Sequence, residues 1–195
     1  MKFNKSAVSG IIILVALMTI IGLSGFNYLF TDELNQPSDQ PVKSNSNPPR
    51  PISMGKISFE TSDKIKIVGD LYGVQNAVGF LVLVPMMPAT KESYVDLAQR
   101  FQNLGYESLA IDLRGHGESD NGPSGYLNFS NSEHQKSILD LQSAVDYLTK
   151  NRGAASDKII FIGASIGANL SLQYISEHQE YKTSVLFSTG LNYRG

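Results

Sequence analysis

A serine stands between two glycines in the stretch FIGASIGANL, residues 161–170, directly after a run of apolar residues. The spacing Gly163-x-Ser165-x-Gly167 suits a sharp turn from a strand into a helix. Such a turn would lift the serine hydroxyl clear of a sheet and leave the first helical amides facing the same space. A nucleophile at Ser165 is one interpretation. The other is a glycine-rich turn that joins strand to helix without chemistry, as in many α/β proteins.

The residues on both sides of this turn predict the elements that a nucleophile turn requires. KIIFIG is a short apolar run that indicates a buried strand, and SIGANLSLQYISEHQ predicts the helix after it. GFLVLVP and YESLAIDL predict two earlier buried strands, and TSVLFSTG predicts a last one. Short apolar runs that alternate with amphipathic stretches are typical of a mostly parallel sheet with helices on both faces. In this context the sequence favours the nucleophile interpretation of Ser165.

Three further segments complete the predicted domain. KISFETSDKIKIVGDLYG predicts two antiparallel strands that turn at Ser62 and Asp63. KESYVDLAQRFQNLG predicts a helix that ends at Gly105. The apolar face of that helix is predicted to consist of Tyr94, Leu97, Phe101 and Leu104. A second amphipathic helix is predicted to start at Asn131 or Ser132 and to end at Gly153.

Composition excludes several classes of protein. The chain of 195 residues has a formal net charge of −2, which indicates one globular domain rather than a nucleic-acid-binding chain. It has no cysteine, which excludes disulfides, thiolate metal sites and a thiol nucleophile. A dinucleotide site would need Gly-x-Gly-x-x-Gly after the first strand, and the glycines around Ser165 have neither that spacing nor that position. We expect no metal or organic cofactor.

The first thirty residues predict a membrane segment. No charge occurs from Ser6 to Phe30, and a helix needs about 20 such residues to span a bilayer. Lys2 and Lys5 precede the run and acidic residues follow it, which places the N-terminus in the cytoplasm and the rest of the chain outside it. A cleaved signal peptide, and hence a secreted protein, is the alternative. We expect an uncleaved anchor, because the run exceeds the roughly 7–15 residues of a signal core.

A linker is predicted between the membrane segment and the folded domain. Residues 31–51 include NQPSDQPVKSNSNPPRP, which is rich in Pro, Ser and Asn and has almost nothing to bury. Such a composition does not offset the entropy of ordering, so we expect a disordered tether. The folded domain is expected over residues 52–195.

Two stretches of the chain resemble the α/β-hydrolase fold family. LVLVPMMPATKESYVDLAQRFQNLGYESLAIDLRGHGES is similar to the third strand, first helix and fourth strand of that family, and GASIGA is similar to its nucleophile elbow. The Arg-Gly-His-Gly-x-Ser loop resembles a loop of the family's esterases, lipases and dienelactone-hydrolase-like members. The resemblance extends from about Ile57 to the end of the chain and implies the same α/β fold.

The resemblance implies roles for three residues. Ser165 would be the nucleophile, and the backbone N–H of Ile166 would supply one donor of the oxyanion hole. The second donor would come from the loop VPMMPA, in which Met87, or less well Met86, occupies the matching position. Many family members have His-Gly there, and apolar packing beneath the loop is the alternative role for these methionines.

The acid and the histidine base of this family follow the elbow, each after a further strand. Only His178 follows Ser165 in this chain, and the predicted helix would place it about 20 Å along the helix axis from the serine. His116 is expected to shape its own loop, and His134 to be solvated. We therefore expect a C-terminally incomplete hydrolase, in which the strand at 184–188 is an open apolar edge of the sheet.

Two functions are compatible with these features. The first is a membrane-tethered, extracytoplasmic serine hydrolase that acts on carboxylic esters or related acyl substrates, in a truncated version without its acid and histidine. The second is a non-catalytic pseudohydrolase that binds a small molecule or a protein partner. A small acyl substrate and a membrane are the expected partners, and nucleic acid is not.

Overall fold

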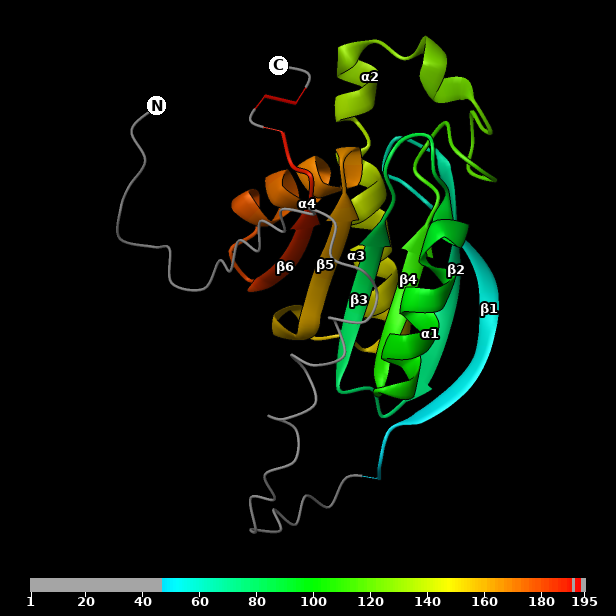
Figure 1. Cartoon of the computed structure of the whole chain (residues 1–195), viewed down its shortest axis with the longest axis vertical. Helices are drawn as coiled ribbons and strands as arrows, with labels where there is room; N and C mark the ends of the chain where they lie inside the picture. The colour runs from blue at the N-terminus through cyan, green and yellow to red at the C-terminus, as the bar shows by residue number, and fades with distance from the viewer. Residues whose placement is uncertain (1–46, 191, 194–195) are drawn as a thin grey trace, which may run out of the picture.

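The computed structural model describes residues 47–190 and 192–193 of the chain (Figure 1). The strands are β1 (Arg50–Glu60), β2 (Lys66–Gln75), β3 (Gly79–Val84), β4 (Tyr106–Ile111), β5 (Ile159–Ala164) and β6 (Thr183–Phe187). The α-helices are α1 (Val95–Asn103), α2 (Asn131–Gln135), α3 (Ile138–Arg152) and α4 (Ile166–Glu177). Three short 3-10 helices are η1 (Lys91–Tyr94), η2 (Gly125–Asn128) and η3 (Ser156–Lys158).

The six strands form one mixed sheet in the order β1-β2-β4-β3-β5-β6. β1, β2 and β4 pair antiparallel, whereas β4, β3, β5 and β6 run parallel to one another. The carboxyl ends of three parallel strands meet at one edge, where Val84 pairs with Gly163 and Ala164 with Phe187. Ser165 follows Ala164 directly, so the predicted nucleophile turn lies where open α/β sheets bind their ligands.

Helices cover both faces of the sheet, as the sequence predicted. Successive side chains of a strand point to opposite faces. Val82 and Val84 pack in a core cluster with residues of α3 and α4, whereas Leu81 and Leu83 pack in a second cluster with Ala98 of α1. α1 therefore lies on one face, and α3 and α4 lie on the other (Figure 1).

The single helix predicted over residues 131–153 is two helices. Ser130 caps α2, and Glu133 completes a capping box with it. The backbone bonds then change to a three-residue spacing, in which Ser137 donates to the His134 carbonyl and Leu139 to the Lys136 carbonyl. This tightening separates α2 from α3, although the predicted end at Gly153 is confirmed.

Leu104 does not belong to the apolar face predicted for α1. The helix ends at Asn103, so Leu104 lies at its C-cap and is 68% exposed. Leu97 and Phe101 pack against the core cluster of this face as predicted.

The N-terminal predictions fall largely outside the part of the chain that the structure describes. The predicted membrane segment, 1–30, and most of the predicted linker, 31–51, precede residue 47. Arg50 and Pro51, which were expected to belong to the linker, begin β1. Within residues 47–190 and 192–193, no helix combines the length and the hydropathy needed to cross a membrane.

β6 is the outermost strand of the described sheet beside β5. Val185 is 40% exposed and Phe187 is 51% exposed. The apolar edge predicted for this strand is thus present in the described part of the chain, and its backbone is open to pairing on one side.

Two glycines allow the first turn of α4 to approach the ends of β3 and β5. A Cβ atom on Gly167 would lie 2.2 Å from the Val84 carbonyl oxygen and 2.7 Å from that of Pro85. A Cβ atom on Gly163 would lie 2.4 Å from the Gly167 carbonyl oxygen. The opposing atoms belong to the backbone and cannot rotate away. Glycine at both positions of the motif is therefore a packing requirement.

Replacing Gly167 by alanine should destabilise the whole fold. The added methyl group would overlap the β3 backbone, and we expect the Gly167→Ala chain to lose about 3 kcal/mol of unfolding free energy. Gly55→Ala is the matched control, because no atom lies within 4 Å of its Cβ position, and its effect should stay within about 0.5 kcal/mol. Denaturant unfolding of the full chain measures both, and equal midpoints for the two variants would contradict the packing argument.

Candidate active site

Ser165 forms the turn between β5 and α4 in a strained conformation. Its φ is 50° and its ψ is −113°, a combination that costs a residue with a Cβ atom on the order of 1–3 kcal/mol. Its amide donates to the Phe187 carbonyl at 2.8 Å, which holds the turn against the end of β6. The side chain is exposed, and the described residues give its hydroxyl no hydrogen-bond partner. The hydroxyl is thus accessible at the carboxyl edge of the sheet.

Ile166 and the loop after β3 border the same turn. Ile166 is the first residue of α4, so its amide is one of the donors that a helix start leaves outside the helical bonding pattern. Met87 is half-buried against the core, and Met86 is 47% exposed. The close approach of Gly167 to the Pro85 carbonyl brings this loop beside the start of α4. The structure therefore gathers Ser165 and both predicted donor segments at one edge.

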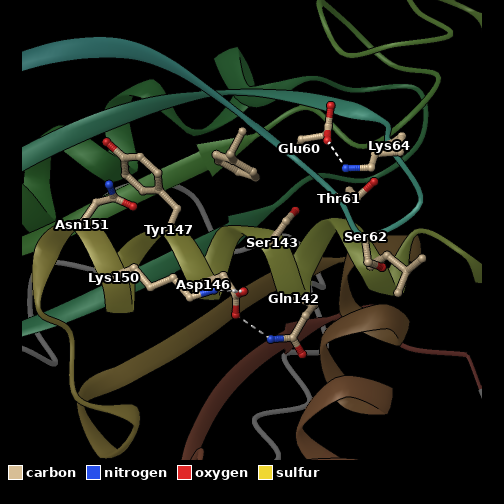
Figure 2. Close-up of a pocket in the computed structure, with 12 residues that line it drawn as sticks. Glu60, Thr61, Ser62, Lys64, Gln142, Ser143, Asp146, Tyr147, Lys150 and Asn151 are labelled. Atoms are coloured by element: carbon tan, nitrogen blue, oxygen red, sulfur yellow. Dashed lines mark hydrogen bonds and ion pairs between the residues drawn. The ribbon is translucent and has the colours of Figure 1, made fainter.

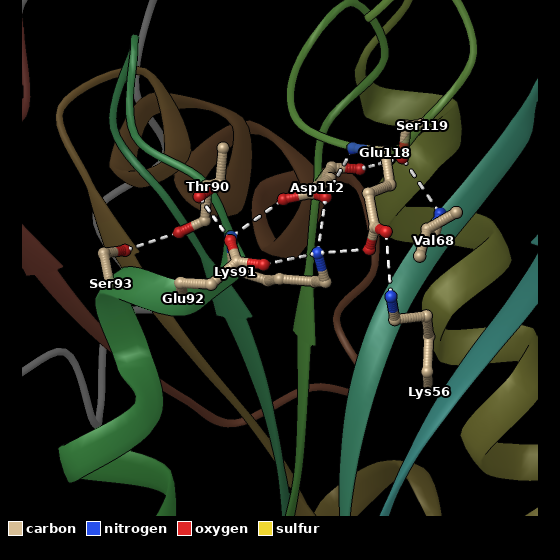
Figure 3. A network of polar contacts seen from close by, with 9 residues as sticks. All are labelled: Lys56, Val68, Thr90, Lys91, Glu92, Ser93, Asp112, Glu118 and Ser119. Carbon is tan, nitrogen blue, oxygen red and sulfur yellow. Dashed lines mark hydrogen bonds and ion pairs between the residues drawn. The ribbon is translucent and has the colours of Figure 1, made fainter. Parts of the chain in front are cut away.

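A buried ion pair anchors the loop after β3 (Figure 3). Asp112, directly after β4, accepts from the Lys91 amide at 2.8 Å and from Lys91 Nζ at 3.0 Å. The amide of Glu118 donates to the same carboxylate at 2.9 Å. At the other end of the loop, the Tyr94 hydroxyl donates to the Val84 carbonyl at 3.0 Å. The segment that carries Met86 and Met87 is thus held at both ends.

Lys91 is 1% exposed, which is unusual for a lysine. Its Nζ also donates to Glu92 at 2.7 Å and to Glu118 at 2.9 Å. Burial lowers the pKa of Lys91, but the hydrogen bonds to Glu92, Glu118 and Asp112 together raise the pKa above its usual value. The amine therefore stays charged with each of its protons donated. The sequence analysis missed the pair of Lys91 and Asp112. The signal that could have indicated it was Asp112 itself, a carboxylate directly after the residues that form β4.

Arg114 forms a second ion cluster, with the buried Asp140 and the more exposed Asp63. Its backbone N–H and its Nε donate to Asp140 at 2.9 and 2.8 Å, and its two terminal nitrogens donate to Asp63 at 2.7 and 3.0 Å. The hydrogen bond from Arg114 lowers the pKa of Asp63 to about 2. This cluster ties the turn between β1 and β2 and the start of α3 to the loop after β4, and the sequence analysis missed it too.

None of the three histidines pairs with Ser165 among the described contacts. His116 is buried, its Nδ1 lies 3.0 Å from the Arg114 carbonyl oxygen, and burial lowers its pKa, so the ring is neutral at pH 7. His134 was expected to be solvated, but it is buried with its ring edge-on to Phe129. His178 stands at the opposite end of α4 from Ser165, as the sequence predicted.

Two cavities open elsewhere in the described structure. One, of about 380 Å³, lies between the β1–β2 turn and α3 (Figure 2). Two of its lining residues, Phe59 and Tyr147, stack on each other. The other, of about 500 Å³, lies between the end of β2 and the segment after α3. Neither is lined by Ser165, Ile166 or Met87. Residues 47–190 and 192–193 contain no group of three His, Asp or Glu side chains placed to hold a metal ion.

The mixed sheet, its two helical layers and the strand–serine–helix turn define an α/β hydrolase. Solved structures share this fold. An esterase of Pyrococcus furiosus is 24% identical with a TM-score of 0.58, over 70% of this chain and 50% of that one. The protein DcsB, solved in complex with its substrate analogue, is 26% identical with a TM-score of 0.63, over 72% of this chain and 46% of that one.

The family model described as serine aminopeptidase S33 matches residues 75–195, and the chain belongs to this family. Two curated fungal proteins are similar to this chain. A polyketide transferase of Stachybotrys chlorohalonatus is 31% identical over 60% of this chain. An acyltransferase of Aspergillus calidoustus is 28% identical over 62% of this chain. The chain spans 38% of the length of each of these relatives.

Removing the charge of Asp112 should destabilise the protein. In Asp112→Asn the buried Lys91 ammonium loses its closest buried counter-charge, and we expect a loss of about 3 kcal/mol of unfolding free energy. Asp146→Asn is the control, since it breaks the exposed pair with Lys150 and should cost less than about 1 kcal/mol. Urea denaturation at pH 7 measures both variants, and a cost for Asp112→Asn as small as that of the control would contradict a stabilising role.

Proposed function

We propose that this chain uses Ser165 as the nucleophile of an acyl-transfer reaction on carboxylic esters or related acyl substrates. The observation that carries the proposal is the turn itself, in which an exposed serine with a positive φ immediately precedes a helix at the carboxyl edge of the sheet. Membership of the S33 family supports the same chemistry.

In the proposed reaction the Ser165 oxygen attacks the acyl carbon and its proton passes through a base to the departing alcohol or amine. The amides of Ile166 and Met87 stabilise the oxyanion that forms in between, at a helix start where the peptide dipoles favour negative charge. Water then releases the acid and regenerates Ser165. An alcohol or amine in place of water would make the protein a transferase, the activity named for its two fungal relatives.

The proposal assigns the base to none of His116, His134 and His178. His116 and His134 are buried in contacts of their own, and the length of α4 separates His178 from the serine. A serine hydroxyl without a base is a weak nucleophile at neutral pH. The placement of the three histidines away from Ser165 is also the observation that favours the alternative function. In that function the protein is a pseudohydrolase that keeps the turn and binds a small molecule or a protein partner without catalysis.

A fluorophosphonate probe distinguishes the two functions. We expect the probe to label the full chain at Ser165, and peptide mapping will locate the labelled residue. Ser165→Ala should abolish the labelling. Ser176→Ala, a substitution of an exposed serine on the same helix, should leave labelling unchanged. Hydrolysis of a p-nitrophenyl ester should likewise be abolished by Ser165→Ala and unchanged by Ser176→Ala. Labelling that survives Ser165→Ala would exclude Ser165 as the nucleophile. A folded chain that is labelled neither as it stands nor when extended at its C-terminus would favour the pseudohydrolase, whereas labelling of the extended version alone would identify truncation.

We also propose that residues 1–30, which lie outside the described residues, anchor the chain in a membrane with the hydrolase domain on the extracytoplasmic side. The uncharged run from Ser6 to Phe30 supports this proposal. The full chain should stay with membranes after high-salt and carbonate washing. Recovery of a soluble chain shortened by about 24 residues would instead identify a cleaved signal peptide.

A further inference from the structure

Asn169 lies one helical turn after Ser165 and contacts it twice. Its backbone amide donates to the Ser165 carbonyl at 3.0 Å, and its Nδ2 donates to the same oxygen at 2.9 Å. Its Oδ1 accepts from the amide of Gly190 at 3.0 Å. One side chain therefore joins the nucleophile turn to the loop after β6, whose strand lies beside β5 and α4 in Figure 1.

These contacts close a ring of hydrogen bonds around two strained residues. The Ser165 amide donates to Phe187, the chain continues through Ser188 to Gly190, and Gly190 returns through Asn169 to the Ser165 carbonyl. Ser165 has a φ of 50° and Ser188 a φ of 56°, a region that residues with a Cβ atom seldom occupy. Such conformations persist only where the surrounding contacts impose them.

The side-chain chemistry of position 169 suits this task specifically. Asparagine donates from its nitrogen and accepts at its oxygen, and both functions are used here by backbone groups of different segments. An aspartate would keep the acceptor for Gly190 but lose the donor to the Ser165 carbonyl. An alanine would lose both.

We propose that Asn169 is a positioning residue that holds the loop 188–190 against the nucleophile turn and thereby keeps Ser165 in its strained, exposed conformation. The inference rests on the proposed role of Ser165 for its effect on reactivity. The bonds on which it is built exist independently of that role. Asn169 contacts no reacting atom in this scheme and acts only through the Ser165 backbone.

The first test is the kinetics of fluorophosphonate labelling of the full chain. Asn169→Asp, which loses one hydrogen bond, should slow the maximal rate of Ser165 labelling roughly tenfold, and Asn169→Ala, which loses both, should slow it at least as much. The probe concentration at half-saturation and the final fraction of labelled chains should not change. A folding defect alone would lower the final fraction and leave the rate of the remaining chains intact. Asn151→Ala, an exposed asparagine of α3, is the control.

The second test is amide hydrogen exchange, which needs no reactivity. Asn169→Ala should accelerate exchange in peptides that cover residues 163–168 and 188–190, whereas Asn151→Ala should not. If the unsubstituted chain is labelled neither as it stands nor when extended at its C-terminus, the proposed function fails and exchange alone decides the inference. Equal exchange in the two variants, or a labelling rate of Asn169→Ala equal to that of the unsubstituted chain, would overturn it.

Discussion

The contact between the first turn of α4 and the end of β3 determines where every group of the candidate site lies. Gly167 leaves no space for a side chain against the Val84 carbonyl, so the helix start is pressed onto the carboxyl edge of the sheet. That position puts the Ser165 amide within 2.8 Å of the Phe187 carbonyl and brings the start of α4 beside the loop after β3. A helix displaced outward by one methyl group would lose the bond to β6 and, with it, a contact that balances the strain of the turn.

The loops at this edge have no regular backbone pairing, and buried charges take its place. The Asp112 carboxylate accepts hydrogen bonds from two backbone amides and one ammonium group. These bonds hold the loops after β3 and β4 together, as backbone bonds between strands hold the sheet together. Burying such a pair costs desolvation energy, and the cost is offset only when every polar atom has a partner. Lys91 meets that condition with three carboxylates. Arg114 repeats the arrangement on the other side of its loop.

The sequence predicted those parts of the fold that depend on local pattern. Short, mainly apolar stretches identified β3, β4 and β5, and the spacing of Gly163 and Gly167 identified the turn, because both signals are contained in adjacent residues. The polar anchors escaped prediction because their partners lie far along the chain. Asp112 is 21 positions from Lys91, and Gly190 is 21 positions from Asn169. The separation of α2 from α3 escaped for a different reason, because it depends on local backbone geometry: the bonds from Ser137 to the His134 carbonyl and from Leu139 to the Lys136 carbonyl have a three-residue spacing that the apolar pattern does not reveal.

β6, one of the two edge strands of the described sheet, also holds the turn that carries Ser165. β6 pairs with β5 on one side only, and two of its apolar side chains are substantially exposed. Edge strands open more readily than central ones, since fewer bonds must break. Because the Phe187 carbonyl accepts the Ser165 amide, any opening of β6 removes a bond from the turn. The conformation of Ser165 is therefore coupled to the state of the sheet edge, through Phe187 from the strand and through Asn169 from the loop that follows it.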